Sequence, residues 1–201
     1  MKKILSIQSS PRGAASQSIQ LANVILDKLR AVHPGAVVET VDLVNLHYPH
    51  LEESHLTSFF TPVEKHSERE RVAVRHSNES IQAIRDADIL VIGAPMYNFN
   101  IHSALKAWID HIVRSGVTFR ISEAGPEGLI KGKKVYLVIS SGGVYSDGPM
   151  KSMDFIEPYL RTILGWIGLT DITVYRVEGL NVPGVKETAM EKAVAAVTVG
   201  Q

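Results

Sequence analysis

Short apolar runs and amphipathic segments alternate along the chain. Runs rich in β-branched residues predict strands, and segments with apolar side chains on one helical face predict helices between them. We expect strands at residues 3–8, 37–43, 89–93, 134–140 and 171–177. We expect helices from residue 19 to Pro34-Gly35, over 68–87, up to Arg114, over 154–167 and over 185–199. Strands that alternate with helices five times are typical of a doubly wound α/β fold.

The stretch from residue 88 to 114 is the one around which we expect the fold to be organised. Residues 89–93 have the length and the β-branched content of a strand buried on both faces. An amphipathic helix with Trp108 on its apolar face ends the stretch. The loop between them is Pro95-Met96-Tyr97-Asn98-Phe99-Asn100. Ligands of open parallel sheets bind beyond the carboxyl ends of the strands, so these aromatic rings predict a flat ligand.

Two segments interrupt the alternation. Residues 44–65 show no periodic pattern and predict a long excursion, and the adjacent Phe59 and Phe60 favour a functional one. Two short β-like pieces around Gly125-Pro126 predict a small hairpin insertion. We find no repeat and no low-complexity segment, and 201 residues are within the size of one core, so we expect a single domain over residues 1–201.

Composition and charge exclude several classes of protein. Lys plus Arg and Asp plus Glu number 21 each, which argues against nucleic acid or an anionic membrane as the main partner. The chain has no Cys, so disulfides, thiolate catalysis and Cys-ligated clusters are excluded. The first apolar run stops at Gln8, short of a signal peptide, and no stretch reaches the roughly 20 apolar residues of a membrane span. We therefore expect a soluble, cytoplasmic protein.

Three loops are predicted to meet at the carboxyl edge of the sheet, namely residues 9–18, 95–100 and 140–143. The first is rich in hydroxyls and opens a helix, an arrangement suited to phosphate. No glycine-rich phosphate motif occurs, so hydroxyl-rich loops would have to hold the group. Each loop also has an ordinary interpretation: Ser16 or Ser18 as a helix cap, Tyr97 and Phe99 as core, Gly142-Gly143 as a turn. Together, a phosphate site and a flat slot with polar donors fit flavin mononucleotide (FMN).

Other chemistry has weaker support in the sequence. The histidines at 47, 50 and 55 could form a metal site, but scattered surface histidines are far commoner in a loop. We therefore expect no metal. The G-x-S-x-G motif of serine hydrolases is absent. Asp110 and His111 are adjacent on a helix and point apart, which argues against a catalytic dyad.

Several motifs together resemble one family. M-Y-N-F-N-I (96–101), G-V-T-F-R (116–120), G-P-E-G-L (125–129), S-x-G-G (140–143) and the Ser-Gln-Ser after the first strand are similar to FMN-dependent NADH-azoreductases, within the flavodoxin-like NAD(P)H:quinone reductase group. The resemblance covers essentially the whole chain. It implies a flavodoxin-like five-stranded parallel sheet of order 2-1-3-4-5, with helices on both faces. It also implies a homodimer with one noncovalent FMN per subunit at the interface, where we expect the partner to cover Trp108.

The resemblance also implies site residues, carried over position by position. The phosphate and ribityl loop corresponds to Ser10, Ser16, Gln17 and Ser18, and the loops around the isoalloxazine correspond to Pro95, Met96, Tyr97, Asn98, Phe99, Ser140, Ser141, Gly142 and Gly143. Ser141 stands where some relatives carry Arg, so the role of its side chain stays open. The substrate slot is expected to include Phe119, with Phe59 or Phe60 contributed across the dimer.

The implied activity is a ping-pong reaction. NADH or NADPH passes a hydride to flavin N5 and leaves, and a quinone or azo compound then accepts two electrons in the same place. Cleavage of an azo bond to two amines needs two such cycles, and no catalytic side chain is expected. The alternatives are a flavodoxin-type electron carrier, which would tend to be strongly acidic, and a flavin-free structural dimer. The physiological acceptor and the preference between NADH and NADPH stay open.

Overall fold

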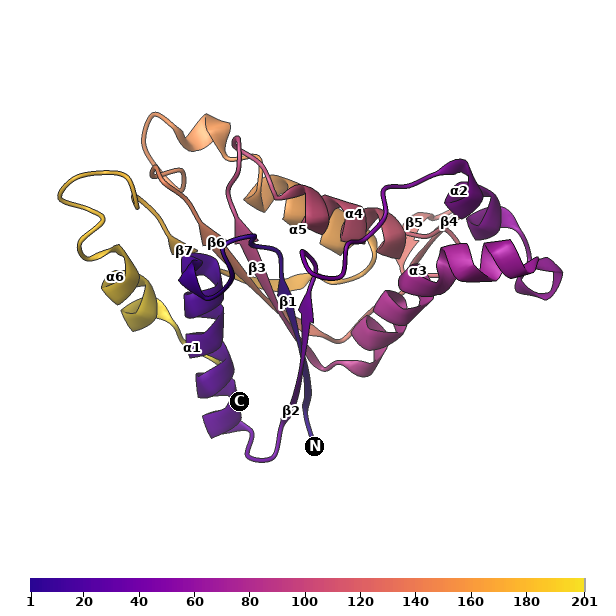
Figure 1. The fold of residues 1–201 in the computed structure, drawn as a ribbon. Coiled ribbons are helices and arrows are strands. Elements are labelled where there is room, and N and C mark those ends of the chain that lie inside the picture. Colours follow the sequence, from indigo (N-terminus) through magenta and orange to yellow (C-terminus); the bar gives the residue numbers. More distant parts are fainter. Residues whose placement is uncertain (201) are drawn as a thin grey trace.

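A parallel sheet of five strands forms the centre of the molecule in the computed structural model, which describes residues 1–200. The strand order is β2-β1-β3-β6-β7, and every neighbouring pair is parallel (Figure 1). This confirms the expected order 2-1-3-4-5. The strands are β1 (Lys3–Gln8), β2 (Val37–Asp42), β3 (Ile89–Pro95), β6 (Lys134–Ser140) and β7 (Asp171–Val177).

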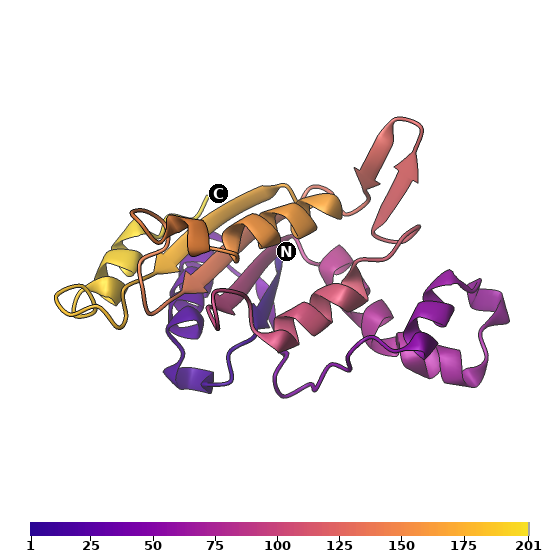
Figure 2. The same cartoon turned by 90° about the horizontal axis from the view of Figure 1, so that it is seen from above.

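Helices cover both faces of the sheet, as Figures 1 and 2 show. α1 (Gln17–Val32) and α6 (Ala189–Ala196) contribute buried side chains to the core on one face. The core on the other face includes buried side chains of α3 (Glu68–Asp86), α4 (Ser103–Ile112) and α5 (Glu157–Trp166). No helix within residues 1–200 has the length and apolar character needed to cross a bilayer.

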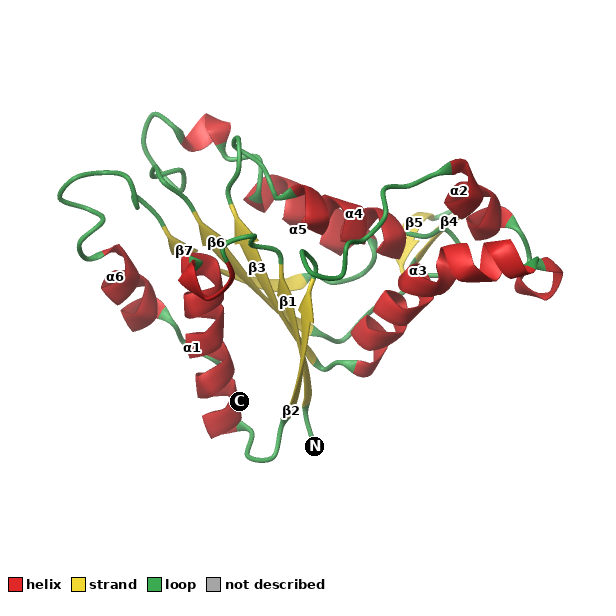
Figure 3. Cartoon of the chain, in the orientation of Figure 1, coloured by secondary structure: helices red, strands yellow, loops and turns green. Residues whose placement is uncertain are grey.

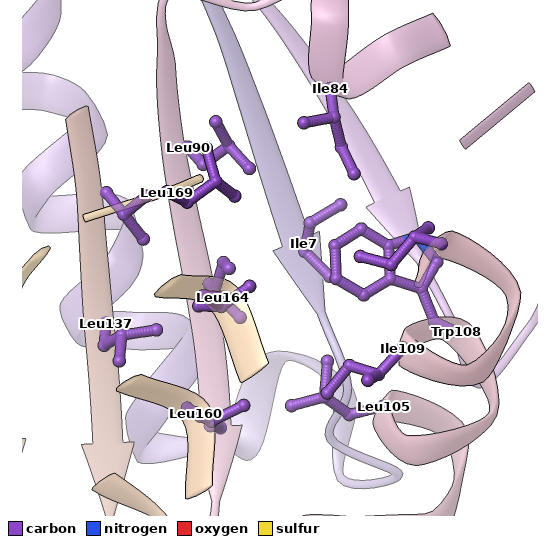
Figure 4. Packing of buried hydrophobic residues seen from close by; sticks show 14 of the residues in the cluster. Ile7, Ile84, Leu90, Leu105, Trp108, Ile109, Leu137, Leu160, Leu164 and Leu169 are labelled. Carbon is purple, nitrogen blue, oxygen red and sulfur yellow. The ribbon is translucent and has the colours of Figure 1, made fainter. Parts of the chain in front are cut away.

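The central strand β3 is buried along its whole length, as its apolar run predicts. Its residues alternate between the two cores, so that Leu90 and Ile92 belong to one and Ile89 and Val91 to the other. The Trp108 ring of α4 packs beside Ile7 of β1 and leaves only 1% of the residue exposed (Figure 4). The expectation that a second subunit must cover Trp108 is therefore wrong, because the chain's own core covers it.

Two helices differ from the expectation. The excursion over residues 44–65 contains a short helix, α2 (Glu53–Phe60), seen in Figure 3 at the far end of α3. The helix α2 has only about two turns, and its apolar residues Leu56 and Phe60 are exposed. The sequence therefore shows no amphipathic pattern that would predict this helix. The closing helix is α6, shorter than the predicted 185–199, because residues before Ala189 form turns.

The predicted hairpin is confirmed as β4 (Phe119–Ser122) paired antiparallel with β5 (Gly125–Gly128). Its predicted turn is wrong, because residues 123–124 form the turn and Gly125-Pro126 belong to β5. It projects from the body of the protein beside the end of α5 (Figure 2). Its base is fixed by Gly128, where a Cβ atom would lie 2.1 Å from the backbone nitrogen of Gly168. Only glycine permits this contact between the hairpin and the residues that follow α5.

Candidate functional site

A pocket of about 190 Å³ lies at the carboxyl ends of the strands. It is formed by the loops that follow β1, β3 and β6, together with the loop that follows β7. The predicted convergence of three loops is thus confirmed, whereas their role in binding stays a prediction. The pocket is lined by Ser10, Arg12, Ser16, Gln17, Pro95, Met96, Tyr97, Ser140, Ser141, Gly142, Leu180 and Asn181.

The loop after β1 presents unused hydrogen-bond donors to the pocket. Ser16 holds the N-cap position of α1, but its side chain makes no capping hydrogen bond and its Oγ instead lies 3.0 Å from the Oγ of Ser18. The first N–H groups of α1 are consequently left without that cap. The Oγ of the buried Ser10 accepts a hydrogen bond from the N–H of Arg12 at 3.3 Å, so its own proton is free to be donated. The capping interpretation therefore does not account for the Ser16 side chain, and an anion suits the arrangement.

Ser18, which was predicted to contact the cofactor, lies too deep in the protein to do so directly. It is fully buried, and its Oγ contacts only the Ser16 hydroxyl among the hydrogen bonds of residues 1–200. It is not among the residues that line the pocket. Ser18 can therefore act on a ligand only through Ser16.

The loop after β3 forms a tight turn at Asn98 and Phe99. The N–H of Tyr97 donates to the carbonyl of Asn100 at 2.9 Å, and the N–H of Asn100 donates to the carbonyl of Tyr97 at 3.0 Å. The φ angles of Asn98 and Phe99 are 49° and 67°, in the left-handed region. Two successive left-handed residues define the type I′ geometry, which is unfavourable for Phe. The turn leaves Phe99 43% exposed, so core packing does not explain this ring.

The loop after β6 is held by close contacts at both glycines. A Cβ atom on Gly142 would lie 2.4 Å from Nδ2 of Asn181, and one on Gly143 would lie 3.0 Å from the Tyr145 ring. The Oγ of Ser141 donates to the carbonyl of Gly143 at 2.9 Å. The Ser141 side chain thus stabilises the loop, and the glycines are required by packing as well as by any ligand.

Sequence reasoning missed three residues of the pocket lining, Arg12, Leu180 and Asn181. Among the described residues that line the pocket, Arg12 carries the one charged side chain. The position of this cation within a hydroxyl-rich loop could have indicated its role from the sequence. Leu180 and Asn181 follow the fifth strand, and the backbone N–H of Asn181 donates to the carbonyl of Gly142 at 2.8 Å. Ligand sites of parallel sheets lie beyond the carboxyl ends of the strands, so the loop after β7 was also a candidate, and it contains Leu180 and Asn181.

The three phenylalanines predicted for the substrate slot lie elsewhere in the single chain. The ring of Phe59 packs under the guanidinium of Arg114, whose Cζ is 4.6 Å from the ring centroid. Phe60 is 78% exposed on α2, and Phe119 packs against Trp166 at 5.5 Å between ring centroids. In Figure 2 the hairpin and α2 lie apart from each other, and both are on the side of the molecule away from the loop that opens α1. Asn98, Phe99 and Gly143 border the pocket loops without lining the pocket itself.

His111 is buried and plays a structural part. Its Nε2 lies 3.0 Å from the carbonyl of Pro49, and burial lowers the pKa of its imidazole. Asp110 instead pairs with Lys106 on the surface of α4, so the two neighbours form no dyad. In the part of the chain that the structure describes, no three His, Cys, Asp or Glu side chains are grouped as a metal site requires.

Two of the larger hollows show how other cavities differ from this pocket in position. One, of about 650 Å³, lies at the opposite, amino-terminal edge of the sheet, where Lys134 pairs with Asp171 and Lys2 pairs with Asp88. The other, of about 570 Å³, shares Tyr97 with the pocket and continues to Tyr159 of α5. Size alone therefore does not identify the site, whereas the convergence of uncapped amides, hydroxyls and a cation beside Tyr97 does.

A parallel sheet of order 2-1-3-4-5 with its pocket at the carboxyl edge defines a flavodoxin-like protein. The chain belongs to the flavodoxin-like fold family, whose model matches residues 2–199. It is 48% identical over 180 residues to an FMN-dependent NADH:quinone oxidoreductase of Herminiimonas arsenicoxydans, covering 90% of this chain and 88% of that one. It is 47% identical over 194 residues to FMN-dependent NADH:quinone oxidoreductase 6 of Burkholderia lata, covering 96% of both chains.

Solved structures agree with this assignment. An FMN-dependent NADH-azoreductase of Bacillus anthracis, in complex with FMN, superposes with a TM-score of 0.85 at 26% identity. The match covers 98% of this chain and 97% of that one. A second azoreductase of Bacillus anthracis gives a TM-score of 0.87 at 28% identity and covers 97% and 98% of the two chains.

Proposed function

We propose that the protein is an FMN-dependent NAD(P)H oxidoreductase that reduces quinones and azo compounds. One observation carries the proposal: an uncapped helix N-terminus, a strained aromatic turn and a double-glycine loop converge on one pocket. These features match the phosphate of FMN, its flat ring and the polar edge of that ring. Relatives named for this cofactor and this activity support the proposal.

The residues present fit the cofactor. Ser10, Ser16 and the first N–H groups of α1 offer donors to a phosphate, and Arg12 adds a positive charge. Met96 and Tyr97 offer apolar surface to the ring. When bound, FMN supplies the two-electron chemistry, accepting a hydride from NADH or NADPH and passing electrons to the acceptor.

The contribution of the chain is binding and orientation. The pocket lining contains no carboxylate and no imidazole, so no side chain in it is suited to general acid–base catalysis near neutral pH. The backbone N–H of Ser141 already donates to the carbonyl of Val177, so the N–H groups of Gly142 and Gly143 are the ones that can stabilise negative charge on the polar edge of the ring. An azo compound would need two rounds of reduction to give two amines.

We infer a homodimer, with one FMN per subunit and a cytoplasmic location. A pocket of about 190 Å³ is below the ~300–1,000 Å³ typical of ligand sites, which supports closure by a second subunit. Exposed apolar side chains that a second subunit could cover lie in two places, with Phe99 and Phe155 near the pocket and Phe60 on α2. Phe60 or Phe59, together with Phe119, would then reach the partner's substrate slot.

The electron-carrier alternative is disfavoured. A flavodoxin-type carrier is expected to be strongly acidic for docking to redox partners, whereas the formal net charge of this chain is zero. The relatives named above are also oxidoreductases, not carriers.

The test is to identify the cofactor and then the turnover. We expect the purified protein to be yellow and dimeric by light scattering, and heat should release one FMN per subunit. NADH oxidation should depend on an added quinone or azo dye. The control is protein stripped of flavin and supplied with riboflavin, which lacks the phosphate and should restore little activity. A colourless protein that does not take up FMN would refute the proposal.

A further inference from the structure

Residues 144–156, here called the 144–156 loop, connect the pocket loop after β6 to α5. The Tyr145 ring packs on Gly143 and lies edge-on to the Phe99 ring, with centroids 6.1 Å apart. At the other end of the loop, the N–H of Phe155 donates to the carbonyl of Phe99 at 3.4 Å. The 144–156 loop therefore touches the pocket loops that follow β3 and β6.

One guanidinium connects the two ends of this loop. Arg176 of β7 donates to Asp154 and to Glu157, at 2.5 Å each, and to Glu178 at 3.4 Å. The Oε1 of Glu178 accepts hydrogen bonds from the backbone N–H groups of Tyr145 and Ser146, at 2.9 Å each, where the loop begins. Asp154 lies where the loop ends. Arg176 thus joins the carboxylates that hold the start and the end of the 144–156 loop.

This cluster differs from an ordinary surface ion pair. The side chains of Arg176, Asp154 and Glu178 are only 13%, 7% and 11% exposed. Burial alone would lower the pKa of Arg176, but its bonds to Glu157 and Asp154 outweigh burial and raise it. Three carboxylates share one cation here, so loss of the guanidinium would leave buried negative charges facing one another.

We propose that Arg176 is a positioning residue for the flavin site. It holds the 144–156 loop against Phe99 and Gly143, and so fixes the aromatic turn and the double-glycine loop in the geometry that receives the ring. The inference rests on the proposed function. Arg176 is not part of the pocket lining, so it acts through these contacts and not on the ligand itself.

The test compares Arg176→Met with Arg161→Met. Arg161 also donates to Glu157, at 2.7 Å, but it is exposed and makes no contact with the start of the loop. Three readouts are used: the FMN affinity, the visible circular dichroism of the bound flavin, and the rate of trypsin cleavage after the exposed Lys151 within the loop. If Arg176 only stabilised the fold, its replacement would not change the spectrum of the bound flavin in a protein that is still folded.

We expect Arg176→Met to weaken FMN binding about tenfold, to change the flavin spectrum and to speed cleavage after Lys151. Arg161→Met should match wild type in all three respects. Arg176→Lys should recover only part of the loss. Lysine keeps the positive charge, but its ammonium cannot bridge several carboxylates as the guanidinium fork does. A folded Arg176→Met protein with wild-type FMN affinity, spectrum and cleavage rate would overturn the inference.

A second variant keeps the test valid if Arg176→Met does not fold. Glu178→Ala leaves Arg176 paired with Asp154 and Glu157 but removes the link to Tyr145 and Ser146. It should show the same weaker binding and faster cleavage, and unchanged values would contradict the proposal. Failure of wild type to bind FMN would refute the proposed function and this role together. Binding that is equally tight in all variants would refute this role alone.

Discussion

Replacing Phe99 by Gly and, separately, by Ala distinguishes the backbone strain of the 97–100 turn from the contribution of its ring. Both variants lose the ring and its edge-on contact with Tyr145, worth about 0.5–1.5 kcal/mol. They differ in the backbone, because position 99 has a φ of 67°. Alanine keeps the left-handed penalty of about 1–2 kcal/mol, whereas glycine avoids it.

The expected difference follows from two opposing terms. Glycine loses about 0.5–1 kcal/mol relative to alanine through the greater freedom of its unfolded chain. The relief of strain exceeds that loss, so Phe99→Gly should be more stable than Phe99→Ala by about 0.5–1 kcal/mol. Urea denaturation of flavin-free protein, with linear extrapolation, measures the difference directly.

Leu56 provides the matched control because it is an exposed apolar residue inside the helix α2. There glycine should be less stable than alanine by about 1 kcal/mol, which is the opposite sign. If Phe99→Gly is no more stable than Phe99→Ala, the turn is not strained as described.

Three further predictions test single residues. Ser16→Ala should weaken FMN binding about tenfold or more, because a hydrogen bond to a charged group contributes about 1.5–3 kcal/mol. An unchanged affinity in a fluorescence titration would show that the phosphate does not bind at Ser16. His111 has a lowered pKa when folded, so its stabilising effect is complete above the unfolded pKa near 6.5 and is lost as pH falls below it. His111→Gln should therefore flatten the loss of unfolding free energy between about pH 7 and 5, and an unchanged slope would assign that loss to other groups. Phe119→Ala should raise the KM for quinone with little effect on FMN retention, and the reverse pattern would place Phe119 beside the flavin.

Sequence patterns identified the parts of this fold that depend on local periodicity and on parallel-sheet topology. The β-branched run of residues 89–93 predicts a strand buried on both faces, and β3 is that strand. Given five such strands, the rule for carboxyl ends brings the 9–18, 95–100 and 140–143 loops together. The pocket confirms that juxtaposition.

The remaining features depend on contacts between distant residues. Trp108 could be assigned to an apolar face, but only packing shows that this face is covered by Ile7 and its neighbours. Asn98 is a residue type compatible with left-handed backbone, but nothing in the sequence indicates that conformation for Phe99, because a bulky residue rarely adopts it. The Arg176 cluster joins positions 154, 157 and 178 across a strand and a helix, a grouping that no local pattern encodes.

The central claim is that bound FMN reacts with donor and acceptor in turn at one pocket. The most direct measurement is anaerobic mixing of the yellow protein with one equivalent of NADH, followed by a quinone in a second mixing step. We predict complete bleaching of the flavin absorbance in the first step and its full return in the second, with parallel double-reciprocal lines in steady state. Flavin that NADH does not bleach, or lines that intersect, would contradict the account.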